Sequence, residues 1–217
     1  MGLLAFRRAR DPLLERFGLR DLSPKVEAAL RTLEAERVAL AAQLAEAERL
    51  ADRDALTQTL NRRGFLRELH RAMSIMERYK RPAAVLYIDL DGFKAINDKY
   101  GHAAGDALLR HVGRLLQESV RESDVVGRLG GDEFGVILNE VSASEAQRKA
   151  ESLADAIDHA VLTHEETIHR VCGSIGLHVI EAVEDPEVAL ARADEAMYAE
   201  KYARRRAAAA RSAFEAF

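Results

Sequence analysis

The sequence predicts an α/β sandwich in which helices flank a mixed, mostly antiparallel sheet, with a separate helix before it. Helical and strand-like patterns alternate from about residue 52 onward, as expected of a layered α/β domain. The pair Gly130-Gly131 separates two apolar runs closely enough for a hairpin. Because a short glycine turn joins antiparallel neighbours, the sheet cannot be all parallel.

The helix before the sandwich begins after Ser23-Pro24, a typical helix start. Its apolar or small residues recur in steps of four and three, interrupted by Arg37. This spacing predicts a coiled coil of about four heptads, through which two copies of the chain pair. A single amphipathic helix packed on its own domain is the alternative. The seam positions are Val26, Leu30, Leu33, Leu40, Leu44, Ala47 and Ala51.

The first 22 residues place Leu13, Leu14, Phe17 and Leu19 among arginines. Such a segment could dock on a regulatory partner protein or a membrane surface, and a locally packed leader explains it equally well. The expected organisation is a leader at 1–22, a dimerising coiled-coil helix at 23–52, a folded domain at 53–206 and a tail at 207–217.

The α/β domain is expected to follow this helix element by element. The periodicity predicts a helix over 62–79, a strand over 83–89, a helix over 103–120, strands over 124–129 and 133–138, a helix over 142–160, a strand near 170–180 and a helix over 187–203.

The overall charge and the apolar pattern exclude several classes of protein. With 32 basic and 36 acidic side chains the formal charge is −4, so no global positive field is available to hold a nucleic-acid polymer. No apolar run approaches the roughly 20 residues of a transmembrane segment, and the start lacks the pattern of a signal peptide. A cytoplasmic location is expected.

Two pairs of acidic residues are candidates for metal chemistry. Asp89 and Asp91 lie two residues apart at the end of an apolar strand, on one face, where their mutual repulsion would be relieved by a hard cation such as Mg²⁺. Asp132 and Glu133 follow the glycine pair, which allows a ligand to approach the backbone closely. A solvated strand end and an exposed acidic turn are the structural alternatives.

Further polar residues could bind a nucleotide. Asn97 and Asp106 offer donors and acceptors suited to the edge of a guanine base, although a helix cap is a competing use. Lys201 and the run Arg204-Arg205-Arg206 could pair with phosphate oxygens, or could form an ordinary charged helix end.

Together these segments resemble the GGDEF domain family of diguanylate cyclases, whose name is spelled here by residues 130–134. The resemblance covers about residues 52–206. The matching segments are Asp54-Ala55-Leu56-Thr57, Leu60-Asn61-Arg62-Arg63, Asp89-Leu90-Asp91-Gly92-Phe93-Lys94 with Asn97-Asp98 and Gly101-His102, Gly130-Gly131-Asp132-Glu133-Phe134, Ser174-Ile175-Gly176, and Asp194-Glu195-Ala196-Met197-Tyr198 with Lys201.

The resemblance implies a fold related to nucleotidyl cyclases and polymerase palms, and an enzyme that condenses two GTP into cyclic di-GMP and two pyrophosphates across a homodimer with Mg²⁺ or Mn²⁺. By similarity the metal ligands are Asp89, the Leu90 carbonyl, Asp132 and Glu133, and the last two are also the catalytic residues. The implied substrate-binding residues are Phe93, Lys94, Asn97, His102, Asp106, Lys201 and Arg205.

Members of this family often carry an Arg-x-x-Asp site for inhibition by the product, and Arg121 and Asp124 stand at the matching place. Feedback inhibition by cyclic di-GMP is therefore expected, with Arg148 as a candidate second arginine. Arg204 and Gln58 stand where the family usually has glycine, which puts local backbone geometry in doubt. A receptor that binds nucleotide without turnover, a cyclase of other base choice and a scaffold with a vestigial domain are the rival functions.

Overall fold

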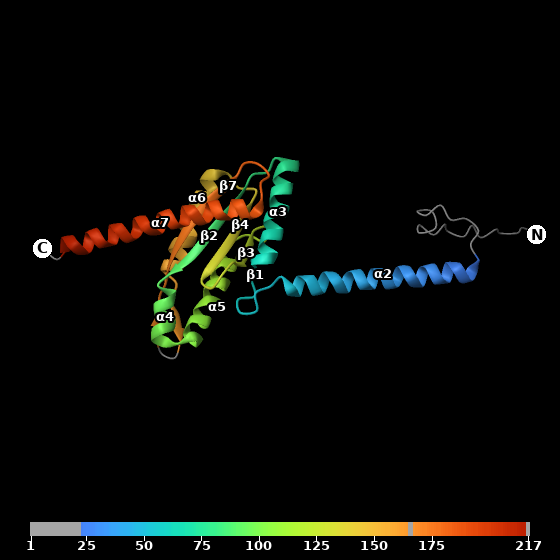
Figure 1. Ribbon diagram of the computed structural model, residues 1–217, viewed down its shortest axis with the longest axis horizontal. Coiled ribbons are helices and arrows are strands. Elements are labelled where there is room, and N and C mark those ends of the chain that lie inside the picture. The colour runs from blue at the N-terminus through green and yellow to red at the C-terminus, as the bar shows by residue number, and fades with distance from the viewer. Residues whose placement is uncertain (1–22, 165–166, 216–217) are drawn as a thin grey trace, which may run out of the picture. The chain divides into compact units, whose positions relative to one another are not determined.

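The computed structural model describes residues 23–164 and 167–215 of the chain (Figure 1). The leader at 1–22, for which a docking role is expected, lies outside the described residues. The chain divides into two compact units, residues 1–50 and residues 51–217.

The first unit contains one long helix, α2 (Pro24–Ala51), which confirms the helix expected before the sandwich. Its predicted seam leaves large apolar side chains in solvent, among them Leu33, Leu40 and Leu44, each more than 60% exposed. Leu50 and Val38 are also exposed. Apolar residues at heptad spacing that no other part of the described chain covers fit a coiled coil.

The second unit is an α/β domain built on a five-stranded sheet of order β1-β3-β4-β2-β7. All pairs in the sheet are antiparallel except β1 with β3, so the mixed, mostly antiparallel sheet is confirmed. The strands are β1 (Leu60–Asn61), β2 (Ala83–Asp91), β3 (Val125–Arg128), β4 (Glu133–Asn139) and β7 (Cys172–Ile180). A separate two-stranded sheet pairs β5 (Leu162–His164) with β6 (Thr167–His169).

The helices of this domain form two layers, because alternate residues of the central strand β2 point to opposite faces of the sheet. Val85 and Tyr87 pack in a core with α3 (Arg62–Tyr79) and α7 (Pro186–Glu215). Leu86 and Ile88 pack in a second core with α5 (His102–Ser119) and α6 (Ala143–Asp158). Each face of β2 is therefore covered, which explains its almost continuous apolar sequence.

The structure differs from the sequence-based expectation in four elements. Helix α4 (Phe93–Tyr100), the β5–β6 hairpin and the two-residue strand β1 were not predicted, because each is too short to show a period. Helix α7 continues to Glu215, beyond the expected end at 203. No glycine interrupts this alanine-rich sequence, and alanine is the strongest helix former. None of the described helices is long and apolar enough to span a membrane.

Candidate active site

The two predicted acidic pairs lie at the same end of the sheet. In the antiparallel register Asp89 on β2 stands opposite Glu133 on β4. The N–H of Leu90 donates to the carbonyl of Asp132 at 3.2 Å, so the backbone of the glycine hairpin lies against the end of β2. Asp132 and Asp89 are close enough to repel each other. The two pairs, 41 positions apart in the chain, therefore form one acidic cluster.

Lys201 supplies the positive charge of this cluster. Its ammonium group pairs with Asp89 and lies 3.1 Å from Oδ1 of Asp91. The hydroxyl of Ser174 donates to the other oxygen of Asp91 at 2.6 Å. Burial alone would lower the pKa of Lys201, but the hydrogen bonds and charges of the two aspartates outweigh it and raise the pKa. Lys201 is thus held as a cation beside two carboxylates.

Asp132 is the carboxylate of the cluster that lacks this compensation. Burial, and then the charge of Asp89, raise the pKa of Asp132 despite the more distant Lys201 and Arg128. Two repelling carboxylates suit a divalent cation, which removes the repulsion. Among the described residues no three His, Cys, Asp or Glu side chains gather in position to hold a metal alone. The donor set therefore fits Mg²⁺, which usually takes one or two carboxylates and completes its shell with phosphates and water.

In the hairpin that carries Asp132 and Glu133, Gly130 leaves space for a neighbouring side chain. A side chain on Gly130 would place its Cβ only 2.1 Å from Oε2 of Glu133. The N–H groups of Leu129 and Gly130 both point at the Glu133 carbonyl, at 2.8 and 3.4 Å, and close the turn. Gly130 therefore leaves room for the Glu133 side chain to fold back over the turn, whereas nothing lies within 4 Å of a Cβ placed on Gly131.

Two neighbours of the hairpin were missed by the sequence analysis. Tyr87 is buried beneath it, and burial together with the charge and hydrogen bond of Glu133 raises the pKa of the Tyr87 hydroxyl. Arg128 donates to the carbonyl of Gly131 through Nε and Nη2, at 3.1 and 2.7 Å. Tyr87 lies two positions before Asp89, and Arg128 two before the glycines, but only the fold shows what each contacts.

Arg128 also connects the hairpin to the start of the domain. Its Nη1 lies 3.2 Å from Oδ1 of Asp54, and that same oxygen accepts hydrogen bonds from the N–H and hydroxyl of Thr57, both at 2.8 Å. Burial opposes ionisation of Asp54, but Thr57 and Arg128 outweigh it, and the pKa of Asp54 is lowered. An ionised Asp54 therefore orients the arginine that holds Gly131.

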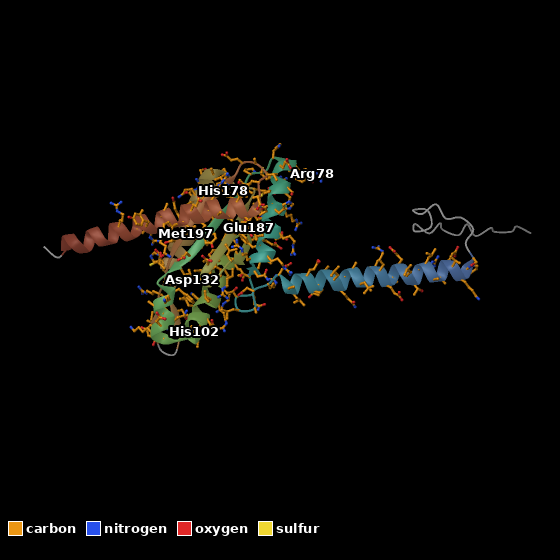
Figure 2. All side chains as sticks on the ribbon, viewed as in Figure 1. Arg78, His102, Asp132, His178, Glu187 and Met197 are labelled. Carbon is orange, nitrogen blue, oxygen red and sulfur yellow. The ribbon has the colours of Figure 1, made fainter. Side chains whose placement is uncertain are left out.

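The residues expected to read guanine lie on α4 and α5. Asn97 is packed so closely over Gly105 that a Cβ there would meet its Oδ1 at 1.9 Å. Within the described residues this Oδ1 is buried and has no hydrogen-bond partner. Asp106 follows Gly105 and is partly exposed, while His102 is exposed where α5 begins, and Figure 2 labels it together with Asp132. An unsatisfied buried acceptor costs free energy, so Asn97 fits a ligand that donates to it.

Three other predicted substrate residues contribute less to this arrangement. Phe93 is buried, and its ring lies against Gly105, whereas Lys94 is exposed on α4. Arg205 lies on α7, but its side chain is not among those that the structure describes. The neighbouring Arg204, which replaces a usual glycine, donates to the carbonyl of Gly173 at 2.7 Å and pairs with Asp158 at 3.0 Å.

The residues expected to bind the product lie apart from the acidic cluster. Arg121 and Asp124 form a tight turn before β3, where the N–H of Arg121 donates to the Asp124 carboxylate at 3.1 Å. The other oxygen of Asp124 accepts from the N–H of Asn139 at the far end of β4. Glu133 and Asn139 are the two ends of β4, a strand of seven residues, and so lie roughly 20 Å apart at the usual rise of a strand. The Arg121 side chain is exposed.

Comparison with known proteins identifies the family. The family model described as "Diguanylate cyclase, GGDEF domain" matches residues 51–207. The chain belongs to the GGDEF family. The curated relatives of this GGDEF chain include diguanylate cyclase TpbB of Pseudomonas aeruginosa, 35% identical over 202 residues that make up 90% of this chain and 46% of that protein. Diguanylate cyclase DosC of Escherichia coli is 39% identical over 150 residues, 68% of this chain and 32% of DosC. The chain thus spans less than half the length of these relatives.

Solved structures of the family are also similar to this chain. The coiled coil and GGDEF domain of DgcB from Caulobacter crescentus, in complex with c-di-GMP, superpose with a TM-score of 0.70 at 29% identity, covering 82% of this chain and 95% of that one. Diguanylate cyclase SiaD of Pseudomonas aeruginosa, in complex with its activator SiaC, gives 0.71 at 26% identity, covering 88% and 73%.

Proposed function

We propose that this GGDEF chain is a diguanylate cyclase, which condenses two GTP into cyclic di-GMP with release of two pyrophosphates. The observation that carries the proposal is the convergence of Asp89 and Asp132 beside the cation of Lys201. This cluster has the charges needed at a site where phosphate is transferred. In each of two successive steps a 3′-hydroxyl attacks the α-phosphate of the other nucleotide, and pyrophosphate leaves.

The residues of the chain have separate tasks in this reaction. Asn97 Oδ1 accepts a hydrogen bond from guanine, which satisfies its buried oxygen, and Asp106 accepts from the donor edge of the same base. Lys201 faces the phosphate oxygens. Asp132 accepts the proton of the attacking hydroxyl, a task that its raised pKa favours.

A divalent cation completes the site. Asp89, the Leu90 carbonyl, Asp132 and Glu133 are its proposed ligands, with Mg²⁺ or Mn²⁺ as the ion. When bound, the ion neutralises charge on the phosphates and orients them for attack. The repelling pair Asp89 and Asp132 supports the proposal, because Mg²⁺ usually takes one or two carboxylates, and Glu133 would join them as a further ligand.

The reaction requires two copies of the chain, because each copy holds one GTP. We propose that α2 pairs two copies through its exposed apolar seam and so brings two half-sites together at a high effective concentration. A regulatory protein that binds the N-terminal segment would change this pairing, and the similar diguanylate cyclase SiaD has been solved in complex with an activator protein. Deletion of residues 1–50 should lower both the mass in solution and the turnover.

Product inhibition is the last part of the proposal. Arg121 is exposed and lies at the end of β4 opposite the acidic cluster, so cyclic di-GMP could bind there without occupying the catalytic residues. Arg121→Ala should remove inhibition by added cyclic di-GMP and leave the initial rate unchanged. Inhibition that persists in this variant would exclude Arg121 from the inhibitory site.

A direct assay tests the reaction itself. The protein is incubated with GTP and Mg²⁺, with a phosphodiesterase present to remove inhibitory product, and the nucleotides are separated by chromatography. Formation of cyclic di-GMP or its hydrolysis product by the wild type, but not by Asp132→Ala or Glu133→Ala, would support the cyclase. Binding of GTP by a dimeric protein without any turnover would instead indicate a nucleotide receptor.

A further inference from the structure

The edge of the sheet formed by β7 is open in the described part of the chain. β7 is the last strand in the sheet order and pairs only with β2 among the strands described. Backbone groups on its other side therefore have no strand to bond with. An edge of this kind is a template for an added strand unless the protein protects it.

One end of this edge is protected by side chains. The N–H of Gly173 donates to Asp158 at 3.0 Å, and its carbonyl accepts from Arg204 at 2.7 Å. The next outward N–H, that of Ile175, donates to the carboxylate of Glu200. These three contacts show that residues 173 and 175 direct their backbone groups away from β2.

The other end of the edge is unprotected. Because backbone direction alternates along an antiparallel strand, Leu177 and Val179 point their N–H and C=O groups outward as residues 173 and 175 do. Within residues 23–164 and 167–215 these groups make no hydrogen bond across the edge. Of the nine residues of β7, Leu177 and Val179 therefore each offer a backbone donor and a backbone acceptor to an added strand.

A groove gives access to this edge. It has a volume of about 530 Å³ and lies between α6 and α7, with residues 175–177 of β7 as its floor. The residues that face it from the two helices include three alanines, Ala150, Ala154 and Ala196. Small side chains on both walls leave the room that an additional strand needs, about 4.8 Å from its neighbour.

The charged residues of this groove all have one sign. Glu151 and Asp155 of α6 line one wall, and Glu200 of α7 lines the other. None of these three carboxylates forms an ion pair in the described part of the chain. Gln147 donates to Glu151 at 2.9 Å, a neutral contact that leaves the charge of Glu151 in place, while Arg204 acts on Glu200 from outside the residues that line the groove. The complement of this surface is a positively charged segment.

We propose that the β7 edge binds an extended, basic segment of a partner protein, which adds to the sheet as a sixth strand. Main-chain hydrogen bonds to Leu177 and Val179 supply the register, and alternate side chains of the segment face α6 and α7. Lysine or arginine on these side chains meets the three carboxylates. When the segment binds, the Ile175 N–H donates to a carbonyl of the added strand instead of to Glu200. The carboxylate of Glu200 then pairs with a basic side chain of the segment.

The probe for this site is an acetylated and amidated hexapeptide in which lysine alternates with valine. We expect it to bind the full chain and to slow hydrogen exchange at the amides of Leu177 and Val179, which only an added strand would protect. A second peptide of the same sequence, with every backbone nitrogen methylated, keeps the charge but has no N–H to donate to the edge. Equal binding of the two peptides would show attraction by charge alone and would overturn the proposal.

Matched variants test the charge of the groove. Glu151→Lys and Asp155→Lys change exposed residues and, combined, should weaken the hexapeptide at least tenfold. Glu77→Lys combined with Glu118→Lys is an equal change of charge at exposed positions of α3 and α5, and it should leave the affinity within twofold of the wild type. Unchanged affinity in the Glu151→Lys, Asp155→Lys variant would refute the assignment. Protection of Leu177 and Val179 without peptide, rising with protein concentration, would mean that a second copy occupies the edge and would equally overturn it.

Discussion

Gly176 on β7 provides the sharpest test of how the fold positions the site. A Cβ at this position would lie 2.0 Å from the carbonyl oxygen of Ala193 and 2.2 Å from the backbone nitrogen of Met197. Both atoms belong to the backbone of α7, so no side-chain rotation can relieve the contact. Figure 2 labels Met197 on this helix, where it crosses the sheet.

The size of the effect follows from these distances. Real Cβ atoms essentially never approach other heavy atoms within 3.0 Å, so in Gly176→Ala the helix must move by about 1 Å. Overpacking of this kind costs about 2 to 3 kcal/mol. For a domain of this size the midpoint of thermal unfolding should fall by about 4 to 12 °C.

Urea unfolding followed by circular dichroism measures this cost. Gly131→Ala is the matched control, because a Cβ there meets nothing within 4 Å, and its stability should remain within about 0.5 kcal/mol of the wild type. A Gly176→Ala protein as stable as this control would refute the reasoning. It would mean that α7 packs less closely on β7 than the structure indicates.

Three further outcomes are expected. Lys201→Met should lower cyclic di-GMP formation about 100-fold, since the cation beside Asp89 is lost, whereas the same change at exposed Lys80 should have no effect on the chromatographic assay. Asp54→Asn should lower the free energy of unfolding at pH 7 by about 2 kcal/mol. Because the folded pKa of Asp54 is lowered, this difference should shrink as the pH falls through that pKa, and a difference independent of pH would contradict the role of its charge. Asp132→Asn should stabilise the metal-free protein at pH 7 by less than about 1 kcal/mol. The pKa of Asp132 is raised, so this gain should vanish at low pH where the wild-type carboxyl is protonated, and a less stable variant would be inconsistent with repulsion by Asp89.

The positions of the acidic residues at the ends of strands could be predicted from the sequence. Asp89 ends an apolar run, and Asp132 follows a glycine turn, so an antiparallel sheet brings both to the same end of the sheet. The sheet type and most of the helices follow from the same patterns. The assigned roles of the site residues remain proposals.

Other contacts could not be predicted because they join residues far apart in the chain. Asp54 and Arg128 are 74 positions apart, and nothing in either segment indicates that they pair. Arg204 was noted only as a departure from a usual glycine, whereas in the fold it caps Gly173 and pairs with Asp158. Helix α4 was missed because its eight residues are too few to show a helical period.

The length of α7 has a practical consequence for work with this protein. The helix begins on the sheet, carries Lys201 and runs without a break to Glu215, 14 residues further (Figure 1). This distance is about 21 Å of continuous helix. A reporter or affinity tag fused directly after Glu215 would extend the helix that holds Lys201 against Asp89. A fusion protein made for measuring turnover should therefore carry a flexible glycine-rich linker between α7 and the fused part.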